Sequence, residues 1–156
     1  MSRLSAQRRP MTPRSLDSAR LRLEFVPNDT TFHATSLRRC GAFRLSCDGL
    51  VAGLVSLIGK SPGHAVIGYD IAPSFRGRGF ASEAVGAVIA AAPGFGLTVL
   101  SAQCRSDNAA SRRVLEKSGF VLASAKPFFA NGQDDTIEYM IYQRSVAHCD
   151  RAPWRR

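Results

Sequence analysis

The sequence predicts an α/β (α+β) fold, a mixed sheet with two helices in its second half. Three observations lead to this prediction. The chain has 156 residues, of which 45% are hydrophobic, so it can form one domain with a substantial core. Its first half shows strand-like alternation of apolar and polar residues between turn residues. Its second half adds two segments with the apolar spacing of helices.

The first half contains four expected strands. Leu21 to Phe25 alternate apolar and charged side chains, which is the pattern of a half-buried strand. Asp48-Gly49 joins the next two strands into a hairpin, because this pair favours the type I′ turn, whose central residues have positive φ. Residues 30–41 are weakly patterned and leave room for one short helical turn. We expect strands at residues 21–25, 42–47, 50–58 and 64–71.

The second half begins with a loop over residues 73–79 and a helix over residues 80–92, which Pro93-Gly94 ends. A second helix begins at an Asn108 cap and is followed by Gly119 at the position that favours positive φ. Within it, Arg112 and Glu116 have the spacing of an ion pair. We expect the remaining elements to be a strand at 97–104, the second helix at 108–118, and a closing strand pair at 120–124 and 136–143.

The net charge of +9 is concentrated near the two ends of the chain. Residues 1–22 hold six Arg and one Asp, and residues 144–156 hold four Arg and one Asp, so the central part is almost neutral. A nucleic-acid-binding domain normally carries its positive charge on a folded face. Binding of RNA or DNA is therefore not the expected main function, although weak attraction to RNA or the ribosome through these Arg-rich ends stays open.

Cysteine spacing and hydropathy argue against three other classes of protein. The four Cys form no CxxC pair, and no His stands at ligand spacing, so neither a metal site nor a disulfide framework is expected. We expect Cys104 to be a small core residue. The longest apolar stretches, residues 49–59 and 84–92, are far shorter than the roughly 20 residues of a membrane helix.

The Arg- and Ser-rich start of the sequence loosely matches a mitochondrial presequence. Pro10 and Pro13 disfavour the amphipathic helix that such a presequence forms. We therefore expect the protein in the cytoplasm.

The stretch from Ile71 to Ala81 carries the clearest chemical signal. A strand ends there, a short Arg- and Gly-rich loop follows, and a helix begins at once. Loop amides and the unpaired N–H groups of a first helical turn, with the positive end of the helix dipole, form an anion site suited to pyrophosphate. Gly77 and Gly79 allow the backbone to approach a phosphate, and the neighbouring Arg residues add positive charge. An ordinary strand-to-helix turn is the alternative interpretation.

This stretch resembles motif A of the GNAT superfamily of acetyl-CoA-dependent N-acetyltransferases, V/I-x-x-x-x-Q/R-x-x-G-x-G/A. Ile71, Arg76, Gly79 and Ala81 fill its defined positions. Residues 108–120 are similar to the N-x-x-S-x-x-V-L-E-K-x-G-F signature of the branch that contains RimJ and RimL, and Ala19-Arg20-Leu21-Arg22-Leu23 resembles that branch's opening strand. The resemblance covers roughly residues 17–144. It implies a mostly antiparallel GNAT sheet with a splayed central strand pair and helices on it, the first helices being shortened here.

The resemblance also implies which residues bind acetyl-CoA. Backbone groups of Asp70 and Ile71 would pair with the pantetheine arm, loop amides would hold the pyrophosphate with help from the Ser82 hydroxyl, and Asn108 and Ser111 would face the sulfur end of the cofactor. Asn108 is equally well explained as a helix cap. The expected cofactor-binding residues are Ile71, Arg76, Gly77, Arg78, Gly79, Phe80, Ala81, Ser82, Asn108 and Ser111.

The expected reaction is direct attack of a primary amine on the thioester, and here the sequence departs from the family pattern. The Tyr that many relatives use as acid corresponds to Leu115, and the acidic residue of others corresponds to Val66. Ser111, His64 and Asp70 are the candidate catalytic residues in their place, each with a structural alternative: a helix-surface serine, a solvated histidine beside a turn, and a residue facing away from the cleft. Tyr69 and Asp70 should point to opposite faces, so that only one of them looks into the cleft.

The predicted protein is therefore an N-acetyltransferase that acts on a protein N-terminus or a small amine. The alternative is a catalytically weak acetyl-CoA-binding sensor or interaction module. Only 16 residues separate Phe25 from Ala42, where relatives have two helices, so the acceptor site should be open or closed by a tail or second subunit. We expect a monomer or homodimer without metal or membrane partner, with a GNAT domain at 16–145 between disordered basic tails at 1–15 and 146–156.

Overall fold

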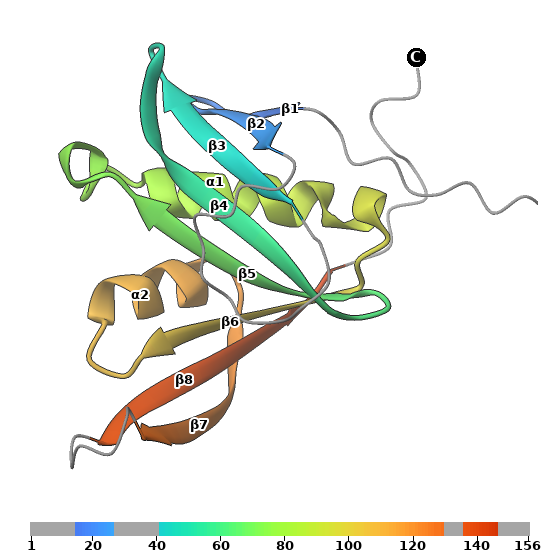
Figure 1. The fold of residues 1–156 in the computed structure, drawn as a ribbon, viewed down its shortest axis with the longest axis vertical. Coiled ribbons are helices and arrows are strands. Elements are labelled where there is room, and N and C mark those ends of the chain that lie inside the picture. Colours follow the sequence, from blue (N-terminus) through green and yellow to red (C-terminus); the bar gives the residue numbers. More distant parts are fainter. Residues whose placement is uncertain (1–14, 27–40, 130–135, 147–156) are drawn as a thin grey trace, which may run out of the picture.

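The computed structural model describes residues 15–26, 41–129 and 136–146. Over these ranges the chain forms one mixed sheet of eight strands with two α-helices (Figure 1). The strands lie in the order β1-β2-β3-β4-β5-β6-β8-β7, and neighbours are antiparallel except β5 and β6, which are parallel. The strands are β1 Ser15–Asp17, β2 Arg22–Val26, β3 Ala42–Cys47, β4 Leu50–Ser61, β5 His64–Ile71, β6 Val99–Arg105, β7 Val121–Phe129 and β8 Thr136–Ser145.

The expected strands of the first half are confirmed. Asp48 and Gly49 join β3 to β4 with φ values of 51° and 77°, as the type I′ turn requires. Strand β4 extends three residues beyond the predicted end, because β5 folds back along its whole length. The short strand β1 was not predicted, since three residues show no usable periodicity, and it begins at Ser15, inside the segment expected to be a tail.

Both expected helices are also present. Helix α1, Phe80–Ala91, ends before Pro93, and the chain continues through a 3-10 turn, η2 Ala92–Phe95, before β6 begins two residues later than predicted. Helix α2, Ala109–Lys117, starts at the predicted Asn108 cap and is followed by Gly119 with φ 78°. The expected ion pair between Arg112 and Glu116 takes another form, because both side chains contact the hydroxyl of Tyr142 in β8.

Strands β5 and β6 separate soon after they meet. Their parallel pairing covers only His64 to Val66 of β5 and Val99 to Ser101 of β6, although both strands continue for several residues. Figure 1 shows the two ribbons diverging towards their carboxyl ends, with α2 beside the gap. The edge of β5 that faces β6 is therefore left without this neighbour beyond Val66. The splayed central strand pair is confirmed.

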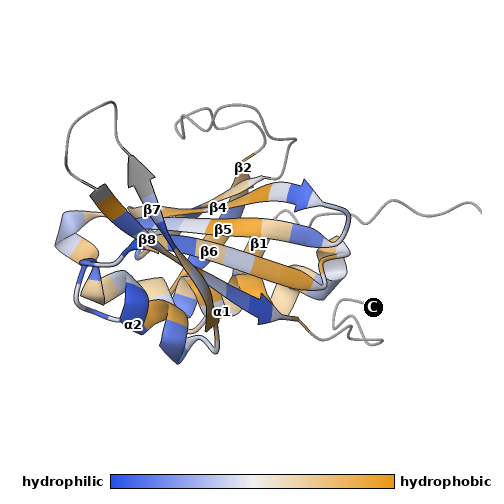
Figure 2. Cartoon of the chain, turned by 90° about the horizontal axis from the view of Figure 1, so that it is seen from below, coloured by the Kyte–Doolittle hydropathy of each residue, from blue (hydrophilic) through white to orange (hydrophobic). Residues whose placement is uncertain are grey.

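The main core lies between the sheet and the helices. Alternate residues of the strands, such as Leu23, Phe43 and Val55, are fully buried and share one face. Helix α1 contributes Val85 and Val88 to the same core, as the helical spacing predicted. Figure 2 shows both helices on one side of the sheet, with hydrophobic residues concentrated in the middle of the central strands. Cys104 is buried in this core, as expected.

Other expectations concern membrane spans, metals and the connection between β2 and β3. In the described ranges, neither helix has the length and hydropathy needed to cross a bilayer. The same ranges contain no group of three or more His, Cys, Asp or Glu side chains arranged to hold a metal ion. The short helical turn was expected within residues 30–41 and the shortened first helices between Phe25 and Ala42. Of this stretch, residues 27–40 lie outside the described residues.

Candidate functional site

A cleft of about 640 Å³ lies where β5 ends, α1 begins and α2 passes alongside. Its volume falls within the range of roughly 300–1,000 Å³ that is typical of ligand sites. It brings together nine of the ten predicted cofactor-binding residues and the predicted Asp70. The lining residues are Tyr69, Asp70, Ile71, Phe75, Arg76, Gly77, Gly79, Phe80, Ala81, Ser82, Asn108, Ala110, Ser111, Arg113, Val114 and Lys117.

The start of α1 is left open for an anion. Its N-cap residue is Gly79, with φ 80°, and no side chain caps the helix. The first intrahelical bond runs from the Glu83 N–H to the Gly79 carbonyl, so the N–H groups of Phe80, Ala81 and Ser82 precede the helical ladder. The start of α2 differs, because the Asn108 side chain accepts a hydrogen bond from the Ser111 N–H at 3.0 Å. Of these two helix starts, α1 therefore offers the better anion site.

The two Arg side chains of the loop take different positions. Arg76 donates from Nε to the Ile71 carbonyl at 2.7 Å and lies 3.4 Å from the Asp70 carboxylate, which closes the loop back onto the end of β5. Arg78 lines a second cavity instead, and its guanidinium lies over the Phe75 and Phe80 rings. Of the predicted cofactor-binding residues, Arg78 is thus the one that the structure does not bring into the cleft.

Tyr69 and Asp70 both line the cleft, so the expectation that only one of them could do so is wrong. Tyr69 lies on the helix-covered face of the sheet, opposite Val55, and its hydroxyl donates to the Ser111 carbonyl at 3.3 Å. Burial raises the pKa of the Tyr69 phenol, which the hydrogen bond to Ser111 only partly offsets. Asp70 belongs to the other face but sits at the end of the strand, where its exposed carboxylate meets Arg76 at the mouth of the cleft.

His64 lies at the opposite end of β5 and does not line the cleft. Strand alternation places it with Val66 on the face away from the helices, and its ring contacts the Ser101 hydroxyl on β6. Partial burial and then the charge of Lys60 lower the pKa of His64. Its ring is therefore largely neutral at pH 7, bonded within the paired part of the two strands.

Sequence reasoning missed the contribution of the outer part of α2 to the cleft. Arg113, Val114 and Lys117 line it together with Ala110. The signal was present, because these residues follow Asn108 and Ser111 at helical spacing and so lie along one side of the helix. The exposed cations Arg113 and Lys117, with Arg76, give the outer part of the cleft a positive rim.

Comparison with known proteins agrees with this geometry. A family model described as an acetyltransferase (GNAT) domain matches residues 4–121. A comparison with curated proteins gives no significant match.

Solved structures give three informative likenesses. RimL, a ribosomal-protein alpha-N-acetyltransferase in complex with coenzyme A, is 26% identical over 70% of this chain and 63% of its own, with a TM-score of 0.64. A Salmonella typhimurium acetyltransferase that modifies the N-terminal serine of a 50S ribosomal subunit protein is 25% identical over 69% of this chain and 64% of its own, with a TM-score of 0.62. The self-immunity acetyltransferase MccE, in complex with acetyl-CoA and AMP, shares the fold at 20% identity, 67% and 60% coverage and a TM-score of 0.60. This chain thus spans less than two thirds of the length of each.

Proposed function

This chain belongs to the GNAT acetyltransferase family, and we propose that it transfers the acetyl group of acetyl-CoA to a primary amine by direct attack in a ternary complex. The observation that carries this proposal is the uncapped start of α1 at the end of a cleft bordered by the splayed strand β5. This arrangement suits a ligand that has an extended amide-containing arm at one end and a pyrophosphate at the other. Acetyl-CoA has both features and supplies the activated acetyl group.

Different parts of the cleft would bind different parts of acetyl-CoA. The free edge of β5 near Asp70 and Ile71 would hydrogen-bond the pantetheine amides in the manner of an added strand. The amides from Arg76 to Ala81, with the Ser82 hydroxyl, would receive the pyrophosphate, while the side chain of Arg76 keeps the loop closed. Arg113 and Lys117 would form ion pairs with phosphate groups of the cofactor at the outer end of the cleft.

Proton transfer to the departing thiolate is proposed for the start of α2. Ser111 lies there beside Asn108, where the positive end of the helix dipole also favours a developing negative charge. Tyr69 is a second donor, because its hydroxyl reaches the first turn of this helix and its raised pKa keeps it protonated at neutral pH. His64 would take part only for an amine that approaches from the face of the sheet opposite the helices.

The proposed acceptor class is a protein N-terminus or a small primary amine. The likeness to two ribosomal-protein N-terminal acetyltransferases supports the first of these. This chain matches 63% of the length of the RimL structure, and the residues between β2 and β3 lie outside those described. The substrate therefore has to be found by direct assay.

The deciding experiment measures thiol release from acetyl-CoA in the presence of a panel of N-terminal peptides and small amines, alongside calorimetric binding of CoA. We expect CoA binding and acetylation of at least one amine, confirmed by mass. Binding of CoA without acetylation of any amine would favour the alternative, a sensor or interaction module. This alternative is supported by Leu115 and Val66, which stand where relatives have a Tyr or an acidic residue. Absence of CoA binding would overturn both.

A further inference from the structure

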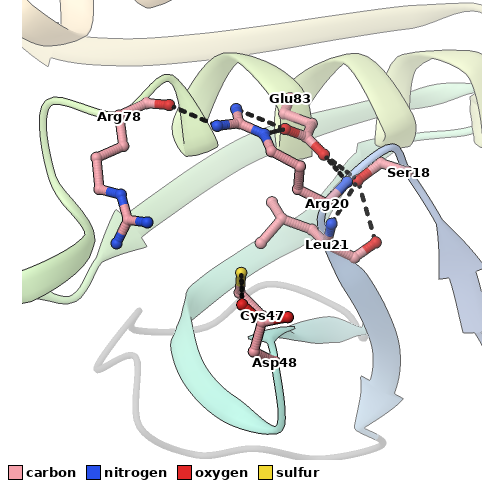
Figure 3. A network of polar contacts seen from close by, with 7 residues as sticks. All are labelled: Ser18, Arg20, Leu21, Cys47, Asp48, Arg78 and Glu83. Carbon is pink, nitrogen blue, oxygen red and sulfur yellow. Dashed lines mark hydrogen bonds and ion pairs between the residues drawn. The ribbon is translucent and has the colours of Figure 1, made fainter.

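The loop over residues 73–79 separates the cleft from a second cavity of about 830 Å³. This cavity lies between the segment that joins β1 to β2 and the β3–β4 hairpin, and Arg78 forms part of its wall. Phe80, the first residue of α1, lines both cavities. The side of the loop that faces away from the cleft is therefore in contact with the N-terminal segment, and Arg20 is the residue that joins them (Figure 3).

Arg20 and Ser18 enclose the carboxylate of Glu83 in the first turn of α1. The Ser18 hydroxyl and the Arg20 backbone N–H donate to Glu83 Oε1 at 2.7 and 2.6 Å. The Arg20 guanidinium reaches Oε2 from both Nε and Nη2 at 2.8 Å. The Glu83 side chain is only 14% exposed, whereas that of Arg20 is 50% exposed, so a shielded carboxylate is held by a half-exposed guanidinium through several charge-assisted hydrogen bonds.

The same guanidinium also holds the backbone of the loop. Its Nη1 donates to the Arg78 carbonyl at 3.1 Å, and its Cζ atom lies 4.5 Å from the centre of the Phe80 ring. In a trans peptide the C=O and the following N–H point in opposite directions. Because the Arg78 carbonyl is turned towards Arg20, the Gly79 N–H is turned away from Arg20, and Gly79 also lines the cleft.

We propose that Arg20 is a positioning residue for acetyl-CoA binding, which fixes the Arg78–Gly79 peptide and neutralises Glu83 so that the loop amides receive the pyrophosphate. The inference rests on the proposed function. It assigns a role to an arginine that does not itself line the cleft. It also explains how a carboxylate can be tolerated within one turn of an anion site, where an unpaired negative charge would repel the ligand.

The experiment measures the dissociation constant of CoA by calorimetry for the full chain, together with the melting temperature of each variant. Arg20→Ala should weaken CoA binding by about tenfold or more, because it removes the contact with the Arg78 carbonyl and leaves Glu83 without its positively charged partner. Arg22→Ala is the matched control, since Arg22 stands two residues along, pairs with Glu24 and makes no contact with the loop. It should change the constant by less than about twofold.

Two further variants separate the two parts of the role. Arg20→Ala combined with Glu83→Gln should recover part of the lost affinity, because the repelling charge is gone, yet bind less tightly than Glu83→Gln alone. Arg20→Lys keeps the charge without the forked geometry and should bind CoA severalfold more weakly than the natural chain. In NMR spectra, the Gly79 amide resonance should shift on CoA addition in the natural chain and by much less in Arg20→Ala.

The outcomes are distinct. If the natural chain binds no CoA, the proposed function fails before Arg20 is tested. If the natural chain binds CoA and Arg20→Ala binds equally well, even with a lowered melting temperature, Arg20 only supports the fold and the inference is overturned. An equal loss of CoA affinity in Arg22→Ala would show that the effect comes from the overall positive charge, and this would also overturn the inference. Should Arg20→Ala fail to fold, unchanged binding by Arg20→Lys overturns the inference and weaker binding supports it.

Discussion

The hydroxyl of Tyr69 donates a hydrogen bond to the carbonyl oxygen of Ser111 at 3.3 Å, joining strand β5 to the first turn of helix α2. The two residues come from the two sides of the cleft, 42 positions apart in the chain. The contact fixes how far α2 stands from β5, and it places a protonated phenol beside the residue that the sequence offered as a proton donor. Both groups therefore have to be compared in any test of the proposed mechanism.

The two candidate donors can be separated by turnover. Ser111→Ala should lower kcat by roughly tenfold while the dissociation constant of CoA stays nearly unchanged, because a serine hydroxyl is a weak general acid. Tyr69→Phe keeps the ring in place and removes only the hydroxyl. If kcat falls with Tyr69→Phe and is unaffected by Ser111→Ala, Tyr69 is the donor and the assignment of Ser111 is wrong.

Gly79 should be essential for binding acetyl-CoA. Its φ of 80° suits glycine, and an added Cβ would lie on the loop 3.5 Å from the Arg20 guanidinium. Gly79→Val should abolish the rise in melting temperature that CoA produces, while the variant stays folded. Gly49→Val is the matched control, because Gly49 has a similar φ of 77° in open space at the hairpin tip. Full stabilisation of Gly79→Val by CoA would contradict the proposed phosphate site.

The positive rim of the cleft should contribute electrostatically to CoA binding. Replacing Arg113 and Lys117 together by Gln should raise the dissociation constant of CoA by about tenfold at low salt, with less effect at high salt, where exposed charges are screened. Lys60→Gln, an exposed cation at the far end of β4, serves as the control and should leave the constant unchanged. Equal affinity for the double variant and the natural chain at low salt would remove both residues from the site.

Glu83 should make folding stability depend on pH. Burial raises its pKa, but the hydrogen bonds from Ser18 and Arg20 outweigh this, so the pKa is lowered from the ordinary 4.5. The stabilisation is therefore fully present above pH 4.5 and is lost as the pH falls through the lowered value. Glu83→Gln should reduce the free energy of unfolding by about 2 kcal/mol at pH 7 and by progressively less below pH 4.5 in urea titrations. A constant difference across this range would exclude the ionised pairing.

The basic ends of the chain should be dispensable for cofactor binding. A chain trimmed to residues 15–146 should bind CoA as tightly as the full chain at moderate salt. These limits are one residue wider at each end than the expected domain, 16–145. The reason is that β1 begins at Ser15, and that the Val146 side chain is buried while its N–H donates to the Thr98 carbonyl. Weak attraction to ribosomal RNA, measured by filter binding, should be lost on trimming. A loss of CoA affinity that persists at high salt would instead show that an end segment completes the site.

Several features could be predicted from local sequence because local chemistry decides them. The hairpin at Asp48-Gly49, the cap at Asn108 and the left-handed Gly119 each follow from the conformations that one or two residues prefer. The spacing of apolar residues gave both helices and most strand boundaries. The loop over residues 73–79 was predicted in the same way, since the strand, the glycines and the helix start are consecutive in the chain.

Only the tertiary structure decided which way the candidate side chains face and what they meet. His64 and Tyr69 lie on the same strand but on opposite faces of the sheet. Tyr69 lies on the face that the helices cover and contacts Ser111, whereas His64 lies on the other face and contacts Ser101. Arg78 belongs to the loop over residues 73–79 but does not line the cleft, while Arg20, 58 residues earlier, donates a hydrogen bond to its carbonyl. Such relationships depend on how strands pair and splay over long sequence separations, and local residue preferences contain no information about them.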